Sequence, residues 1–343
     1  MNQQHGGFVY VQTNDADHNE VVVFERRADG ALERLDSYLT GGRGSGAPHL
    51  PSQSSLVLAD GRLFVTNAGN DEVTLFAVEG RRLAVVDRVA AGGSAPRSVA
   101  VHGRLVYTLN TGGDPSVSGF VLESGERLTP LAGSTRPLGA GSDPAQVAFS
   151  PDGKTLLVTD RASNSIHAFA VGDDGILQDR VTHPSSGATP YGFDVTADGV
   201  LIVTEAAGAQ IGKASASSYK LEGPGRLTPV SGAVGNARSE VCWAVISKDG
   251  RIAFVTNFGD GTISTYEIAQ DGSIELRDSV AATTVDGEPG IRDEALTSDG
   301  RYLYALHADT GRVFGWEVGV DGALEALGSA NGLPLTAAGL AAS

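Results

Sequence analysis

The sequence predicts an all-β fold, a seven-bladed β-propeller with four-stranded antiparallel blades that forms a single domain over residues 1–343. A phrase of apolar runs with a polar ending recurs along the whole chain, and Asp-Gly pairs stand between the runs. No stretch sustains the apolar spacing of three and four residues that an amphipathic helix requires. The composition agrees, because 46 glycines and 19 % charged residues suit many short strands joined by tight turns.

The recurring phrase is of YVTN type and marks the second strand of each expected blade. Its last residue is polar, and most of these polar residues follow one another at intervals of about 43 to 52 positions, the length of a four-stranded blade. The seven copies are, in chain order, Val9–Thr13, Leu63–Asn67, Val106–Asn110, Leu156–Asp160, Leu201–Glu205, Ala253–Asn257 and Leu303–His307.

Asp-Gly pairs supply the tight turns within the blades. Two-residue hairpin turns need positive φ, which glycine adopts freely and aspartate tolerates, so we expect a hairpin at each pair. The pairs between first and second strands are Asp60-Gly61, Asp152-Gly153, Asp198-Gly199, Asp249-Gly250 and Asp299-Gly300. The pairs between the last two strands are Asp29-Gly30, Asp174-Gly175, Asp271-Gly272 and Asp321-Gly322.

The two ends of the chain complete the expected ring. The N-terminal copy begins with its second strand, and the C-terminal segment 335–342 is an extended stretch that can supply the missing innermost strand. Pairing of the N- and C-terminal strands in one blade closes the ring and removes the sheet edges that an open array would expose.

Composition limits the partners of the protein. A net charge of −16 without a cluster of Lys or Arg repels a phosphate backbone, so we expect no nucleic-acid partner. No apolar stretch reaches the length of a membrane span and the N-terminus has no signal-peptide pattern, so we expect a cytoplasmic monomer. The single cysteine, Cys242, excludes an intrachain disulfide, and the seven histidines lack zinc-binding spacing, so we expect neither a metal nor another cofactor.

The propeller topology predicts where a functional site lies. In each blade the first strand starts, and the second strand ends, beside one mouth of the central channel, so polar residues from all blades gather there. The second-strand ends are Thr13, Asn67, Asn110, Asp160, Glu205, Asn257 and His307. The first-strand starts are Gln53, Arg97, Gln146, Tyr191, Cys242, Trp243, Arg292 and Asp293.

Asn and Asp residues at strand ends commonly bond to the adjacent turn, which makes a structural role the first interpretation for them. Glu205 differs, because it puts a longer acid at a position with little local use for it, and His307 is a candidate acid/base partner. Long connections on the same face, 206–218 and the glycine-rich 41–46, are candidate binding loops. Trp243 is interpreted either as an aromatic wall of the site or as part of the core.

These residues resemble the lactonase family of seven-bladed β-propellers, which includes a bacterial 6-phosphogluconolactonase and a fungal 3-carboxy-cis,cis-muconate lactonising enzyme. The resemblance covers essentially the whole chain, and its motifs are Pro151–Lys154, Val203–Ala206, Val255–Gly259 and Asp299–Tyr304. The pairs Ser52-Gln53, Gln146-Val147 and Cys242-Trp243 resemble one bacterial branch of the family. The resemblance implies a metal-independent enzyme whose catalytic acid matches Glu205, with a histidine and arginines nearby.

Two positions depart from the family pattern. The blade-four strand reads Asp143–Gln146 where a His-x-His pattern is expected, and Tyr191 replaces the arginine of blade five. A substrate with several negative charges is therefore less suited, since Arg97 and Arg292 are the only arginines expected at the rim and together hold one carboxylate.

The resulting hypothesis is a lactonase-like hydrolase or lactonising isomerase that acts on a lactone or an unsaturated carboxylic acid by acid/base chemistry. Glu205 and His307 are its expected catalytic residues. The expected substrate-binding residues are Gln53, Arg97, Gln146, Tyr191, Trp243, Asn257, Arg292 and Asp293. Two alternatives stay open: a non-catalytic propeller that binds a small ligand or a partner protein, and a Ca²⁺ site formed by Asn110, Asp160, Glu205 and Asn257.

Overall fold

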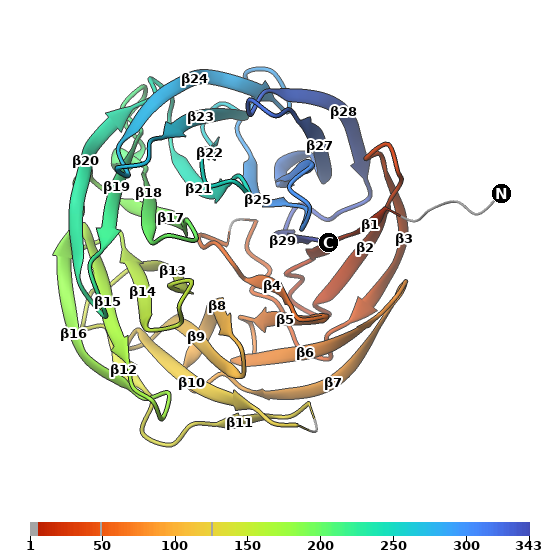
Figure 1. Cartoon of the computed structure of the whole chain (residues 1–343). Coiled ribbons are helices and arrows are strands. Elements are labelled where there is room, and N and C mark those ends of the chain that lie inside the picture. The colour runs from red at the N-terminus through yellow and green to blue at the C-terminus, as the bar shows by residue number, and fades with distance from the viewer. Residues whose placement is uncertain (1–5, 49, 125) are drawn as a thin grey trace.

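A computed structural model describes residues 6–48, 50–124 and 126–343, and it confirms the all-β fold. Seven antiparallel sheets are arranged in a ring around a central channel (Figure 1). Within the described ranges, helical structure is limited to two 3-10 turns, η1 (Ala207–Ala209) and η2 (Ala308–Thr310). No helix there is long and apolar enough to cross a membrane.

The blades are numbered in chain order, and their strands are given from the channel outward. Blade 1 contains β29 (Ala338–Ala342), β1 (Gly7–Gln12), β2 (Glu20–Arg26) and β3 (Leu32–Leu39). Blade 2 contains β4 (Leu56–Ala59), β5 (Arg62–Asn67), β6 (Glu72–Glu79) and β7 (Arg82–Ala90). Blade 3 contains β8 (Ser94–His102), β9 (Leu105–Gly112), β10 (Ser116–Leu122) and β11 (Leu128–Pro130), and the short β12 (Arg136–Pro137) also pairs with β10.

The second half of the ring repeats the pattern without additional strands. Blade 4 contains β13 (Pro144–Phe149), β14 (Thr155–Asp160), β15 (Ser165–Val171) and β16 (Leu177–Pro184). Blade 5 contains β17 (Pro190–Val195), β18 (Val200–Glu205), β19 (Ser215–Leu221) and β20 (Leu227–Gly235). Blade 6 contains β21 (Val241–Ile246), β22 (Ile252–Asn257), β23 (Thr262–Ile268) and β24 (Ile274–Thr283). Blade 7 contains β25 (Ile291–Leu296), β26 (Tyr302–His307), β27 (Arg312–Val318) and β28 (Leu324–Asn331).

Blade 1 closes the ring with strands from both ends of the chain, as the sequence predicts. β29 pairs antiparallel with β1, and the amide of Ser343 donates a hydrogen bond to the carbonyl oxygen of Phe8 at 2.9 Å. Figure 1 shows the C-terminus beside the channel, next to β1. Because β29 covers the inner side of β1, this strand presents no unpaired edge to the channel.

The core lies between neighbouring blades, in stacked layers that follow the ring. In one layer, Val9 and Val11 of blade 1 pack with Tyr302 and Tyr304 of blade 7. The second strand of each blade is buried on both faces, which is why it appears in the sequence as an uninterrupted apolar run. Burial of each such side chain stabilises the fold by about 1.5–3 kcal/mol.

The Asp-Gly turns form hairpins, but they are not all of the expected two-residue kind. The Asp60-Gly61 pair is a two-residue turn in which both residues have positive φ, 47° and 72°. The Asp152-Gly153 pair instead lies in a four-residue connection between Ser150 and Thr155. There the Asp152 carboxylate accepts hydrogen bonds from the Ser150 hydroxyl and the Lys154 amide, so aspartate holds the turn through its side chain.

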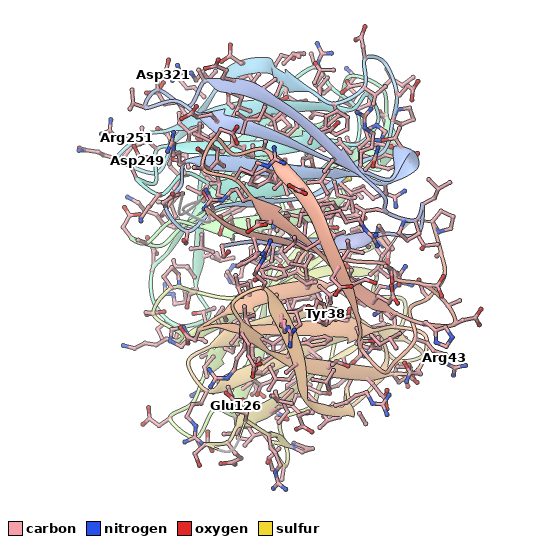
Figure 2. The ribbon with its side chains drawn as sticks, turned by 90° about the vertical axis from the view of Figure 1, so that its right-hand side faces the viewer. Tyr38, Arg43, Glu126, Asp249, Arg251 and Asp321 are labelled. Carbon is pink, nitrogen blue, oxygen red and sulfur yellow. The ribbon has the colours of Figure 1, made fainter. Side chains whose placement is uncertain are left out.

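The channel has two different ends. The turns between first and second strands and between third and fourth strands lie at one end, which we call the turn face. The connections between blades lie at the other end, which we call the mouth face. Figure 2 shows Asp249, Arg251 and Asp321 of the turn face on the left and Arg43 of the mouth face on the right.

Candidate active site at the mouth face

A β-bulge near the start of the innermost strand recurs in blades 3 to 7. The pairing register between the first and second strands shifts there, which leaves one or two residues of the first strand without a partner in the ladder. A bulge bends its strand and re-aims the side chain of the unpaired residue. The unpaired positions at the mouth face include Arg97, Ala145, Tyr191, Cys242 and Arg292.

Aromatic side chains form the floor of the mouth. The ring centroids of Tyr191 and Trp243 lie 5.5 Å apart with an interplanar angle of 58°. Both residues are buried together with Cys242, and Phe258 packs against them. Nε1–H of Trp243 donates to the carbonyl oxygen of Ser52 at 3.0 Å, so the indole is held in one orientation. We call Tyr191, Trp243 and Phe258 the aromatic floor.

Three arginine side chains surround the aromatic floor. The guanidinium carbon of Arg161 lies 4.9 Å from the centroid of the Tyr191 ring, and that of Arg292 lies 5.6 Å from the centroid of Phe258. Arg97 is close to Arg161, since burial and then the charge of Arg161 lower the pKa of Arg97. The mouth thus brings three arginines together in a protein whose net charge is −16.

Carboxylates form ion pairs with two of these three arginines. Arg161 pairs with Asp143 at 2.6 Å and Arg292 pairs with Asp309 at 3.0 Å, and both acids are exposed to solvent. The Nε–H groups of Arg97 and Arg292 are buried and have no hydrogen-bond acceptor among the described residues. A carboxylate or phosphate of a ligand supplies acceptors of the geometry that guanidinium groups recognise.

A segment between blades 1 and 2, residues 50–55, crosses the channel beneath the mouth, and we call it the crossing segment. Gln53 of this segment pairs with the backbone of Ala244 in blade 6, donating to its oxygen at 2.8 Å and accepting from its nitrogen at 3.1 Å. Blades 2 and 6 are not neighbours in the ring, so this pair spans the channel axis. Gly192 makes room for it, because a Cβ there would overlap the Gln53 amide oxygen. The crossing segment separates the mouth from the channel interior.

Three residues that we expected to bind substrate contact the backbone of other blades. Gln53 is engaged as described, and Gln146 pairs with both backbone groups of Phe193 at 2.6 and 3.0 Å. Asp293 accepts a hydrogen bond from the amide of Gly339 at 2.8 Å. All three are buried, so the geometry favours a role in holding the blades together.

The polar residues at the second-strand ends lie in the walls between blades. Glu205 is fully buried, and its carboxylate accepts hydrogen bonds from the hydroxyls of Ser185, Ser215 and Ser217 and from the amide of Gly187, at 2.5 to 3.2 Å. Burial raises the pKa of Glu205, although these hydrogen bonds oppose the shift. Ser185 and Gly187 belong to the connection from blade 4, so Glu205 ties two blades together.

The same kind of contact recurs around the ring. The Asn67 side-chain oxygen accepts from Asn19 and Thr40 of the preceding blade, and that of Asn257 accepts from Asn236 of the preceding connection. The remaining second-strand ends are also buried, and they are Thr13, Asn110, Asp160 and His307. The four residues proposed as Ca²⁺ ligands therefore lie in four different walls. The described residues contain no group of three His, Cys, Asp or Glu that could hold a metal ion.

His307, the second expected catalytic residue, is fully buried at the end of β26. Its Nδ1 lies 3.1 Å from the hydroxyl of Thr310, and its ring packs against Phe314 at a centroid distance of 6.1 Å. Burial lowers the pKa of His307 and so favours the neutral ring. Glu205 and His307 lie in the walls of blades 5 and 7, so they do not form a pair.

The two expected binding loops are anchored segments. The connection 206–218 is shorter than expected, because β19 already begins at Ser215. It is tied down by a hydrogen bond of 3.1 Å from the amide of Gly212 to the hydroxyl of Ser239. In the segment 41–46, glycines allow the close packing of blades 1 and 2, since Cβ atoms there would overlap neighbouring residues.

Two residues that complete the mouth, Arg161 and Phe258, were not expected from the sequence. Arg161 directly follows Asp160, and Phe258 directly follows Asn257, so each comes one position after a second-strand end. Only two arginines were expected at the rim, and the structure adds Arg161 as a third. Arg161 opens the connection from β14 to β15 and Phe258 opens that from β22 to β23, so both follow from the expectation that second strands end at the mouth.

Comparisons with known proteins agree with the architecture. The family described as "Lactonase, 7-bladed beta-propeller" matches residues 3–125, 116–212 and 204–331. An uncharacterized protein of Staphylococcus epidermidis is 23 % identical over 313 residues, which cover 88 % of this chain and 76 % of the relative. The periplasmic gluconolactonase of Pseudomonas aeruginosa has a similar structure, with a TM-score of 0.75, 18 % identity and coverage of 98 % of both chains. A putative 6-phosphogluconolactonase of Bacteroides fragilis gives a TM-score of 0.77 at 16 % identity, over 100 % of this chain and 99 % of that one.

Proposed function

This chain belongs to the family of seven-bladed β-propeller lactonases, and we propose that its mouth face binds a small anionic lactone, or the unsaturated acid that cyclises to one, and catalyses ring opening or closure. The observation that carries the proposal is the position of Arg97, Arg161 and Arg292 around the aromatic floor. A carboxylate or phosphate of the substrate fits the guanidinium groups, and the apolar part of a lactone fits against Phe258, the partly exposed member of the aromatic floor.

Lactone hydrolysis requires the protein to position the substrate and to stabilise the charge that develops on it. In the hydrolytic direction water adds to the lactone carbonyl, the bond between the carbonyl carbon and the ring oxygen breaks, and the ring oxygen leaves with a proton. Negative charge develops on the carbonyl oxygen in the transition state, and guanidinium N–H groups stabilise it. Loss of one such donor in other enzymes costs about 10²–10³ in kcat.

Glu240 is the carboxyl group that we assign to proton transfer. It stands directly before β21 at the mouth, is half-buried, and acts electrostatically on the Cys242 thiol beside it. Burial raises the pKa of Glu240 toward the range in which a carboxyl group both accepts and returns a proton. Among the described residues Asp143 and Asp309 pair with arginines, whereas Glu240 forms no ion pair.

The structural relatives indicate which substrates to test first. One carries the name of a gluconolactonase and another that of a putative 6-phosphogluconolactonase, so sugar lactones with and without a phosphate form a matched pair. Lactones that bear a carboxylate complete the set.

The proposal is tested by steady-state hydrolysis of these lactones with the wild type and with the variants Arg161→Gln and Arg292→Gln. For the anionic lactones we expect each variant to raise KM by about tenfold or more, because a charge-assisted hydrogen bond is worth about 1.5–3 kcal/mol. KM for a neutral lactone should change little. Arg251→Gln, which removes an exposed arginine on the turn face (Figure 2), should leave all constants unchanged.

Two results would contradict the proposal. If Arg161→Gln changed KM for neutral and anionic lactones by the same factor, the arginines would not be recognising the anion. Binding of the anionic lactones without any turnover, in the wild type, would support the alternative of a propeller that binds a small ligand without chemistry.

A further inference from the structure

The channel interior below the crossing segment is a cavity of about 470 Å³. The innermost strands of blades 1, 2, 4, 5, 6 and 7 line it, and it reaches Pro151 and Ala342 at the turn face. Most of the lining is apolar, with Phe149 and Phe193 as its aromatic members. Because Gln53 and the rest of the crossing segment lie above it, this cavity is distinct from the mouth with its arginines.

Glu294 lines this cavity, and among the described residues its carboxyl group has neither an ion-pair nor a hydrogen-bond partner. Its exposed fraction is 5 %, and neither carboxylate oxygen has a hydrogen-bond donor among the described residues. A buried carboxylate without donors is costly, so native structures rarely retain one without a use. The side chain therefore indicates a ligand that brings its own hydrogen-bond donors.

Two neighbouring acids, Asp194 and Asp293, differ from Glu294 because their carboxylates accept hydrogen bonds. Asp194 accepts hydrogen bonds from the amides of Val195 and Ile246, each at 2.8 Å, and Asp293 accepts one from Gly339. Burial and then the charges of Asp194 and Asp293 raise the pKa of Glu294. No Lys or Arg is found among the lining residues, so the cavity has an excess of acidic groups within apolar walls.

The chemistry of the lining distinguishes between possible cations. A divalent metal ion requires several oxygen, nitrogen or sulfur ligands, and the described residues contain no group of three His, Cys, Asp or Glu that could hold one. A primary ammonium group needs only one carboxylate, to which it donates hydrogen bonds, and its alkyl chain gains from apolar walls such as Phe149 and Phe193.

We infer that the channel interior is a binding site for a small organic ammonium ion, with the ammonium group on Glu294 and its apolar part against the inner strands. The site opens at the turn face and is independent of lactone chemistry at the mouth face.

Isothermal titration calorimetry with hexylammonium chloride at pH 8 tests the inference. Wild-type protein is expected to bind the ion, and Glu294→Gln, which keeps the shape and removes the charge, is expected to weaken binding about tenfold or more. Hexanol, the neutral analogue, should bind the wild type more weakly than hexylammonium. Glu275→Gln removes an equal charge on the exposed strand β24 and should bind as the wild type does.

Other outcomes would overturn the inference. Equal affinity of wild type and Glu294→Gln would place the ion elsewhere, and no binding to the wild type would mean that Glu294 simply carries a proton. Heat of binding from CaCl₂ that depends on Glu294, without any from hexylammonium, would assign the cavity to a metal ion. If Glu294→Gln does not fold, Glu294→Met, which also removes the charge, takes its place.

Discussion

Among single residues, the fully buried Glu205 and the half-buried Glu240 are two acids whose surroundings differ. Burial raises the pKa of both, but Glu205 accepts four hydrogen bonds in the wall between blades 4 and 5, whereas Glu240 stands at the mouth without an ion-pair partner among the described residues. A carboxylate whose oxygens already accept hydrogen bonds stabilises the structure, while one that lacks partners can exchange a proton with a substrate.

The change Glu205→Gln tests the role that the family resemblance implies against the role that the wall position indicates. Glutamine leaves one acceptor oxygen and turns an NH₂ group toward Ser215 or Gly187, so we expect the free energy of unfolding to fall by about 1–3 kcal/mol. Urea denaturation measures this loss, and kcat/KM is determined per folded molecule. Glu275→Gln is the control for the lost charge. Undiminished stability together with abolished turnover would assign Glu205 to catalysis.

Among the strands, polar side chains connect one element to the next. Asp160 at the end of β14 accepts hydrogen bonds from the hydroxyl of Ser142 and the amide of Asp143 in the preceding connection, at 2.8 and 2.9 Å. It also lies 3.3 Å from Nε2 of His167 on β15. Burial alone would raise the pKa of Asp160, but the hydrogen bonds from His167, Asp143 and Ser142 outweigh it and lower the pKa.

This contact should make the stability of the protein depend on pH. Because the folded-state pKa of Asp160 lies below the unfolded value of 3.8, its contribution is present above about pH 4 and is lost as the pH falls below that value. Asp160→Asn should lower the free energy of unfolding by about 1–3 kcal/mol at pH 7. Thermal unfolding at pH 7, 5, 4 and 3 measures the difference, which should shrink at the acidic end. If the stability difference between wild type and Asp160→Asn stayed constant across this range, the pKa of Asp160 would not be lowered in the folded protein.

The strands were predictable from the sequence, and the bulges were not. Runs such as Leu201–Glu205 carry the period of the blade in their own residues, so local pattern is enough to place them. A bulge is a property of two paired strands, and nothing local marks Tyr191 or Cys242 as the residue that the register skips. Long-range pairing also explains the Gln53 side chain, which was expected at the rim. Its partner, Ala244, is 191 positions away, so no local pattern indicates the contact.

For the whole molecule, ring closure decides whether the seven sheets act as one unit. β29 is the innermost strand of blade 1, and it packs against the innermost strands of blades 7 and 2, β25 and β4. Leu340 of β29 lies in the core layer shared by blades 1 and 7 and also lines the channel interior. The contact between the chain ends therefore supports both a core layer and the proposed ammonium site.

Deletion of residues 338–343 removes this closure and should lower Tm by about 10 °C or more, because a core layer is opened and β1 gains an unpaired edge. Calorimetry should show a broadened transition, and light scattering should show association through that edge. The matched control is a circular permutant in which a short Gly-Ser linker joins Ser343 to Gly6 and the chain is reopened between β7 and β8. Every strand stays paired in this permutant, so its Tm should remain close to that of the wild type. If the truncated chain unfolds as cooperatively and at the same temperature as the wild type, the terminal strand is dispensable and the ring is held by its blade-to-blade layers alone.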